Sequence, residues 1–149
     1  MEIEWPYGPE SIPMTVQVAD NWPATPAGPA TILVAGIDST AHVTWTVPVP
    51  HNLTLGGSFL LRAYVESIGP GEEKQLGADV NVPVVPGATD YAADIAIPGG
   101  TLLGEGELFG GVPVSGLYKI VAVLQHLNGG VASEASGFAE ATFRMFRTP

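Results

Sequence analysis

Residues 116–123 read Gly116-Leu117-Tyr118-Lys119-Ile120-Val121-Ala122-Val123, and the apolar run that they begin continues to Leu127. Apolar side chains occupy both alternating faces of this run. That pattern predicts a central β-strand that is covered on both sides. The segment Asn128-Gly129-Gly130 follows at once and is a turn signal, so we expect the strand to end there.

Seven further segments show period-2 alternation or short apolar runs of strand length. They lie at residues 14–19, 31–35, 43–47, 58–67, 74–82, 90–97 and 138–147. The 19 Gly and 14 Pro residues are scattered along the chain and leave little room for long helices. Only residues 131–141 tolerate a helix by composition. We therefore expect an all-β domain, a two-sheet antiparallel β-sandwich of about eight strands.

The chain of 149 residues is long enough for one well-buried core, and no linker marks a second domain. Residues 1–13 contain three prolines and are expected to form an extended N-terminal arm. Residues 14–149 are then the β-sandwich domain. The arm is too apolar for a solvated tail, so we expect it to pack on this domain or on a neighbour through Ile3, Trp5, Tyr7 and Ile12.

The Gly116-x-Tyr118 opening of the apolar strand resembles the sixth strand of immunoglobulin-like and fibronectin type III-like sandwiches. In those folds the tyrosine hydroxyl bonds back to upstream backbone and forms a tyrosine corner. The resemblance implies an immunoglobulin-like sandwich in which Ile120 stands where antibody domains place a cysteine. It also implies that Trp45 is the buried tryptophan of the core. The chain has no cysteine, so the disulfide of antibody domains is missing.

The charge balance excludes several classes of partner. The chain has 5 Lys and Arg residues against 15 Asp and Glu residues, a formal net charge of −10. Phosphate backbones and anionic lipid surfaces are bound by clusters of basic residues, so we expect neither nucleic acid nor membrane binding. The N-terminus lacks the basic and apolar regions of a signal peptide. A cytoplasmic location, or a place in an assembled particle, is the default expectation.

The sequence gives little indication of a catalytic site. Ser115 lacks the Gly-x-Ser-x-Gly context of a nucleophile and is expected to be a turn serine. The three histidines are far apart in the sequence and none has the spacing of a metal ligand, so we expect surface imidazoles at His42, His51 and His126. Glu105 and Glu107 could face a pocket as paired carboxylates, but their spacing alone is no argument for glycoside hydrolysis.

Among cofactors, calcium is the least implausible. Loops of a sandwich could bring together oxygen ligands from Asp79, Asp90, Asp94, Glu105 and Glu107. The sequence contains no contiguous calcium-binding loop, however. Solvated acidic faces that keep the protein soluble explain the same residues and are the favoured interpretation.

The hydropathy of the chain favours interaction over catalysis. Only 13% of the residues are charged, and the mean hydropathy is +0.27. Apolar side chains must therefore occupy part of the surface, and large exposed apolar patches mark interaction sites. We expect a non-catalytic structural or protein-interaction module with a protein partner or further copies of itself. The candidate interaction residues are Trp5, Tyr7, Trp22, Leu60, Tyr64, Val121 and Val123.

A carbohydrate-binding module is the alternative function. Such a module would use the flat rings of Trp5, Tyr7, Trp22 and Tyr64 as stacking platforms for a glycan. Trp5 and Trp22 both lie next to proline in segments expected to be loops or arms. The competing interpretation is that these two rings pin their segments onto the sandwich, because a buried tryptophan contributes a large apolar area.

Overall fold

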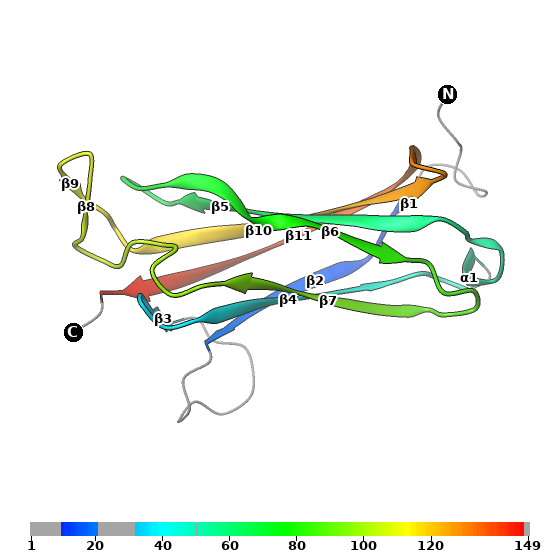
Figure 1. The fold of residues 1–149 in the computed structure, drawn as a ribbon, viewed down its shortest axis with the longest axis horizontal. Coiled ribbons are helices and arrows are strands. Elements are labelled where there is room, and N and C mark those ends of the chain that lie inside the picture. Colours follow the sequence, from blue (N-terminus) through cyan, green and yellow to red (C-terminus); the bar gives the residue numbers. More distant parts are fainter. Residues whose placement is uncertain (1–9, 21–31, 50, 148–149) are drawn as a thin grey trace.

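The computed structural model describes residues 10–20, 32–49 and 51–147 as two β-sheets that face each other (Figure 1). The strands are β1 (Glu10–Ser11), β2 (Met14–Asp20), β3 (Ile32–Val34), β4 (Ser39–Thr46), β5 (Ser58–Ser67), β6 (Glu73–Pro83), β7 (Asp90–Ile97), β8 (Leu108–Phe109), β9 (Val112–Pro113), β10 (Leu117–Asn128) and β11 (Val131–Phe146). One helical turn, α1 (His51–Thr54), precedes β5. Within these residues no helix is long and apolar enough to cross a membrane.

The strand order confirms the expected sandwich. The larger sheet has the order β1-β11-β10-β5-β6, with β3 also paired to β11, and the smaller sheet has the order β2-β4-β7. Pairing is antiparallel except where β1 and β3 run parallel to β11. All eight expected strands are present. The three additional strands, β1, β8 and β9, have two residues each, which is too short for a periodic signal.

The core lies between the sheets and follows the alternation of the sequence. The inward side chains of β5, from Phe59 to Val65, are fully buried. Trp45 of β4 is buried as well; it stacks on Tyr91 at 5.7 Å between ring centroids and meets the Phe59 ring edge-on at 5.6 Å. Trp45 belongs to the smaller sheet, whereas antibody domains place their tryptophan in the sheet of the tyrosine-corner strand. The tryptophan is therefore central to the core but differs in position from the antibody pattern.

Tyr118 forms the expected corner at the start of β10. Its side chain is fully buried, and its hydroxyl donates a hydrogen bond of 2.7 Å to the backbone carbonyl of Leu103. Burial raises the pKa of Tyr118 to about 12. The ring stacks on Phe143 of β11 at 5.7 Å. This one side chain therefore ties the connection between β7 and β10 to the larger sheet.

One expectation about β10 was wrong, and the open question at residues 131–141 is resolved. The outer face of β10 is not covered, because Leu117 and Val123 are each 38% exposed. Its apolar residues lie on both faces because one face is core and the other is partly exposed surface. Residues 131–141 form no helix but the first part of β11, which pairs with β10 from Asn128↔Val131 onward. Sheet pairing thus overrides the helix tolerance of this segment.

The described part of the N-terminal segment packs on the sandwich. Ile12 is buried, and its backbone N–H donates to the carbonyl of Ser136 at 2.7 Å. At this point the chain crosses from β1 in the larger sheet to β2 in the smaller one. A Cβ added at Gly137 would lie 2.5 Å from the carbonyl oxygen of Ile12, so glycine permits the crossing. The arm residues Ile3, Trp5 and Tyr7 lie outside the described residues.

His126 is not a surface imidazole, contrary to expectation. It is buried on the inner face of β10, where its ring meets Phe59 edge-on at 5.5 Å. Its Nε2 lies 2.7 Å from the carbonyl of Gly56 and its Nδ1 lies 2.8 Å from the hydroxyl of Ser133. These contacts fit a neutral ring that donates from Nε2 and accepts at Nδ1. Burial lowers the pKa of His126 below the ordinary 6.5.

Replacement of Tyr118 by Phe tests the corner. Loss of the hydroxyl leaves the Leu103 carbonyl without this donor, so we expect the free energy of unfolding to fall by about 1–3 kcal/mol. Urea unfolding at pH 7 measures the change. Tyr64→Phe is the matched control and should change stability by less than about 0.5 kcal/mol, since Tyr64 is exposed. Equal stabilities of the two variants would contradict the assigned role of the Tyr118 hydroxyl.

The buried imidazole predicts a pH dependence of stability. Because the pKa of His126 is lower in the folded than in the unfolded chain, the unfolded state binds more protons near the unfolded pKa of 6.5. Stability should therefore be fully present above that pH and decline as the pH falls below it. Urea unfolding between pH 8 and pH 5.5 should show this slope, and His126→Gln should flatten it. Parallel pH profiles for the two proteins would refute the assignment.

Candidate functional site

The outer face of the larger sheet gathers the four candidate interaction residues that the structure describes. The register places Val121 of β10 opposite Tyr64 of β5. Val123 lies opposite Arg62, so Leu60 is its diagonal neighbour on β5. Side chains directly opposite and diagonal across a sheet are within contact range. The four apolar residues therefore form one group on this face.

Phe138 of β11 extends this group, and sequence reasoning did not select it. Phe138 lies opposite Val123 and is 67% exposed, more than either Tyr64 at 40% or Val123 at 38%. The signal was present in the alternation of residues 138–147, because Phe138 stands on the opposite face from the buried Phe143 and Met145. We call Leu60, Tyr64, Val121, Val123 and Phe138 the outer-face patch.

Ion pairs surround the outer-face patch. Arg62 Nη2 lies 3.0 Å from the Asp79 carboxylate, and Lys119 lies 3.7 Å from both Glu66 and Glu140. These side chains project from β5, β6, β10 and β11. Two cations thus stand against three acids around the patch, so the ion pairs reduce the local negative charge without cancelling it.

The Arg62–Asp79 pair is held by hydrogen bonds. Asp79 also accepts a bond of 2.8 Å from the Gln75 amide. The hydrogen bond to Asp79 raises the pKa of Arg62, and the bonds from Arg62 and Gln75 lower the pKa of Asp79. Both side chains are exposed, so the pair contributes little to stability and serves mainly to fix the charge pattern.

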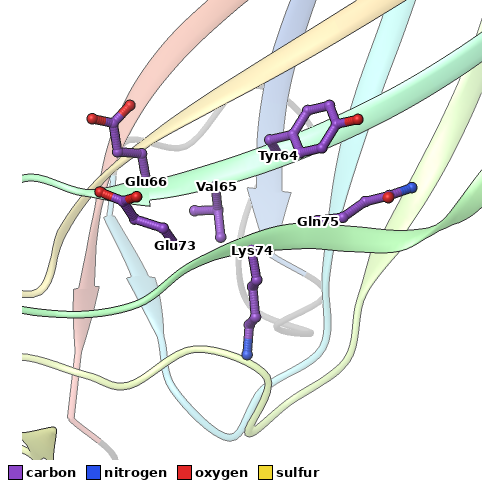
Figure 2. A pocket seen from close by; sticks show the side chains of 6 residues that line it. All are labelled: Tyr64, Val65, Glu66, Glu73, Lys74 and Gln75. Carbon is purple, nitrogen blue, oxygen red and sulfur yellow. The ribbon is translucent and has the colours of Figure 1, made fainter. Parts of the chain in front are cut away.

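A shallow hollow of about 320 Å³ lies beside the patch, between β5 and β6 (Figure 2). It is lined by Tyr64, Val65, Glu66, Glu73, Lys74 and Gln75. Glu66 and Glu73 are direct partners across the two strands. Lys74 extends away from them in Figure 2 and bonds to Glu72 and to the carbonyl of Thr101. The hollow thus combines one exposed aromatic ring with two carboxylates and an amide.

The three loop aromatics proposed from the sequence cannot be placed on this face. Trp5, Tyr7 and Trp22 lie outside the described residues. Their roles as arm anchors or glycan platforms therefore stay predictions. Of the aromatic candidates, Tyr64 alone is placed, and it is exposed at the edge of the hollow.

The acidic residues considered for calcium are dispersed. Asp94 pairs with His42, Asp79 with Arg62, and Glu105 with Arg144 at 3.1 Å. A Glu107 oxygen accepts a hydrogen bond from the backbone N–H of Gly104. Across residues 10–20, 32–49 and 51–147, no three His, Asp or Glu side chains lie close enough together to hold a metal ion.

Ser115 has a structural role in the turn before β10. Its hydroxyl donates to the carbonyl of Ile68 at 2.6 Å and accepts a bond from the backbone N–H of Leu117. These bonds tie the start of β10 to the loop between β5 and β6. The turn-serine expectation agrees with this geometry.

Sequence comparison identifies no relatives: no family model matches the chain, and no curated protein matches it. Among solved structures, the chain is similar to part of a β-glucosidase from Listeria innocua in complex with glucose. That likeness has a TM-score of 0.50 and 9% identity, and it covers 94% of this chain. The chain spans only 17% of the length of the glucosidase.

Two further solved structures are similar over nearly the whole chain. One is the CARDB domain of the PF1109 protein from Pyrococcus furiosus in complex with di-metal ions, with a TM-score of 0.43, 12% identity, and coverage of 97% of this chain and 94% of that domain. The other is AggA, the major subunit of aggregative adherence fimbriae type I from Escherichia coli, with a TM-score of 0.44, 10% identity and 99% coverage of both chains. At such low identity these likenesses concern the fold alone.

Proposed function

We propose that the chain is a non-catalytic structural or protein-interaction module, a subunit of a larger assembly that uses the outer-face patch as a contact surface. The observation that carries this proposal is the group of exposed apolar side chains across β5, β10 and β11, of which Phe138 is the most exposed. Contiguous apolar surface of this kind costs free energy in water and is retained where a partner covers it.

The charge pattern supports the same proposal. Three of the five cations, Arg62, Lys119 and Arg144, project from the larger sheet and are paired with acids. These pairs reduce the negative charge that a partner meets on this face. Paired charges around an apolar centre are also the usual arrangement of a polar rim around an interface core.

A glycan-binding module is the second candidate, and the hollow beside Tyr64 favours it. An exposed phenol ring can stack on the apolar face of a sugar, while Glu66, Glu73 and Gln75 offer hydrogen-bond partners for hydroxyl groups. The hollow is shallow and open, so it would hold a short segment of a chain rather than enclose a small molecule.

Light scattering at micromolar concentration tests the assembly proposal. We expect a mass above the 15.4 kDa of one chain, or a stable complex with a partner recovered in a native pull-down. Phe138→Glu should abolish the contact, because it buries an unpaired charge at the most exposed residue of the patch. Ala92→Glu is the matched control, since Ala92 is exposed on β7 in the other sheet.

The outcome that would contradict the proposal is a 15.4 kDa species without a partner, or a contact that Phe138→Glu leaves intact. A glycan array would then test the second candidate. Binding that is lost in Tyr64→Ala and kept in Phe138→Glu would assign the face to a glycan.

A further inference from the structure

The outer edge of β11 is paired at its two ends and unpaired between them. β1 pairs with Ala135 and Ser136 near the start of β11, and β3 pairs with Arg144 to Phe146 at its end. None of the residues that the structure describes pairs with positions 138–142 on this edge. Figure 1 shows β1 and β3 at opposite ends of β11. Residues 138–142 are therefore an open stretch of strand edge, which we call the edge gap.

The backbone of the edge gap presents hydrogen-bonding groups to this side. The Ser136 carbonyl accepts from the Ile12 N–H at 2.7 Å, and the Phe146 carbonyl accepts from the Ala35 N–H at 2.8 Å. Successive carbonyls of a strand alternate between its two edges, so those of residues 138, 140 and 142 face the same side as the carbonyl of Ser136. Among the described residues, no backbone group bonds to them there. A row of unpaired N–H and C=O groups is a template for a further strand.

The inner face of β11 is less covered along the edge gap than beside it. Ala135, Phe143 and Met145 are buried, whereas Ala139 and Ala141, which lie between them, are only half-buried. All five side chains share the same parity and point toward the core. A strand in the edge gap would therefore place two inward side chains, opposite Ala139 and Ala141, over partly exposed apolar surface.

The N-terminal arm has the sequence of such a strand. Apolar and polar residues alternate along it, with Ile3, Trp5 and Tyr7 on one face and Glu2, Glu4 and Pro6 on the other. In a strand parallel to β11, inward residues turn their backbone toward β11, as the buried Ile12 does with its N–H. The nitrogen of the outward Pro6 then faces away from β11, where proline is tolerated. An antiparallel strand would need a Pro6 N–H in the ladder, so the parallel direction is favoured.

The segment that precedes β3 is less suited to the edge gap. Extended backward in the register of β3, it would place Pro29 opposite Ala141. That position is an inward one, whose N–H must point to β11, and proline has no N–H. Backbone pairing that continues from β3 would therefore stop before it reached Ala141.

The arm of the same copy cannot reach the edge gap in the parallel direction. Parallel pairing that begins with Ile3 at the first inward position puts Pro6 opposite Thr142. Glu10 of β1 lies opposite Ala135, which is seven residues earlier on β11 and therefore about 23 Å away at about 3.3 Å per residue. The four residue steps from Pro6 to Glu10 span at most about 14 Å. The strand must therefore come from another copy.

We infer that the N-terminal arm of one copy fills the edge gap of another copy as a short strand parallel to β11. Ile3 then lies opposite Ala139 and Trp5 opposite Ala141, and both side chains point toward the core of the neighbour. Addition of a strand to an open edge and exchange of a segment between identical chains are common routes to assembly. This contact goes beyond the proposed function, because it does not rest on the outer-face patch.

One pair of like charges opposes this contact and gives its first test. The register sets Glu4 opposite Glu140, and like charges directly opposite each other destabilise a sheet. Lys119 lies 3.7 Å from Glu140 and offsets part of the repulsion. Glu140→Gln should therefore lower the Kd of self-association by about 1.5- to 5-fold, as sedimentation velocity at micromolar concentrations would measure. An unchanged or raised Kd would contradict this register.

Engineered cysteines test the contact between chains directly, because the chain has no cysteine of its own. Glu4→Cys and Glu140→Cys are prepared as separate variants and mixed with oxidised glutathione. The register holds these two positions within disulfide distance, so the mixture should give a disulfide-linked dimer on a non-reducing gel. Glu4→Cys mixed with Ala92→Cys is the matched control and should give only the background of each variant alone, since Ala92 is exposed on β7 in the other sheet.

The arm side chain provides a second control. Trp5→Glu, added to the Glu4→Cys chain, should abolish the linked dimer, because it would bury a charge against the core of the neighbour. Trp5→Phe should retain the dimer. Thermal unfolding of each variant checks that the domain stays folded. A mixture that links no better than the Ala92→Cys control, or linkage that Trp5→Glu leaves intact, would overturn the inference.

Tyr64→Glu in both cysteine variants separates the inference from the proposed function. Tyr64 belongs to the outer-face patch but lies on β5, two strands away from β11. Linkage that persists with Tyr64→Glu shows that the arm contact is independent of the patch. Linkage that disappears there contradicts the arm contact. If no linkage forms but an association that depends on Phe138 remains, the proposed function stands and the inference fails.

Discussion

The hydrogen bond from the Tyr118 hydroxyl to the Leu103 carbonyl joins the start of β10 to the connection between β7 and β10. The position of that connection depends on this bond. A buried phenol needs a partner for its hydroxyl, because an unpaired buried donor costs free energy. Leu103 supplies that partner from the connection between β7 and β10. The bond therefore fixes the segment that continues into the β8–β9 hairpin, so a feature of the core also determines what the surface presents.

Strand parity determines which residues of the larger sheet are core and which form its outer face. On β10 the even-numbered side chains from Tyr118 to His126 are buried, and the odd-numbered Val121 and Val123 face outward. A shift of register by one residue would exchange the two sets. The same parity places the polar side chain of His126 in the core, where Ser133 and Gly56 supply its hydrogen-bond partners.

The sequence predicted the sandwich well because its strands are long and alternate cleanly, as Phe59 to Val65 and Tyr91 to Ile97 do. The prediction failed where strand pairing or side-chain packing determines the structure. The buried state of His126 depends on Gly56 and Ser133, which lie on other segments. The hairpin of β8 and β9 was not predicted, because its strands have only two residues each. The glycine-rich sequence around them is typical of an irregular loop. The outer-face patch was predicted in part, because the strand alternation turns its apolar residues outward. Phe138 was the member that the sequence analysis did not select.

The distribution of charge bears on how a strongly acidic chain can hold an exposed apolar patch. A net charge of −10 keeps most approaches between copies repulsive and so opposes non-specific aggregation. Repulsion is reduced at the outer-face patch, where ion pairs offset part of the negative charge. In the proposed assembly, the acids that disfavour other contacts direct association to this patch, so specificity comes from repulsion as well as from attraction.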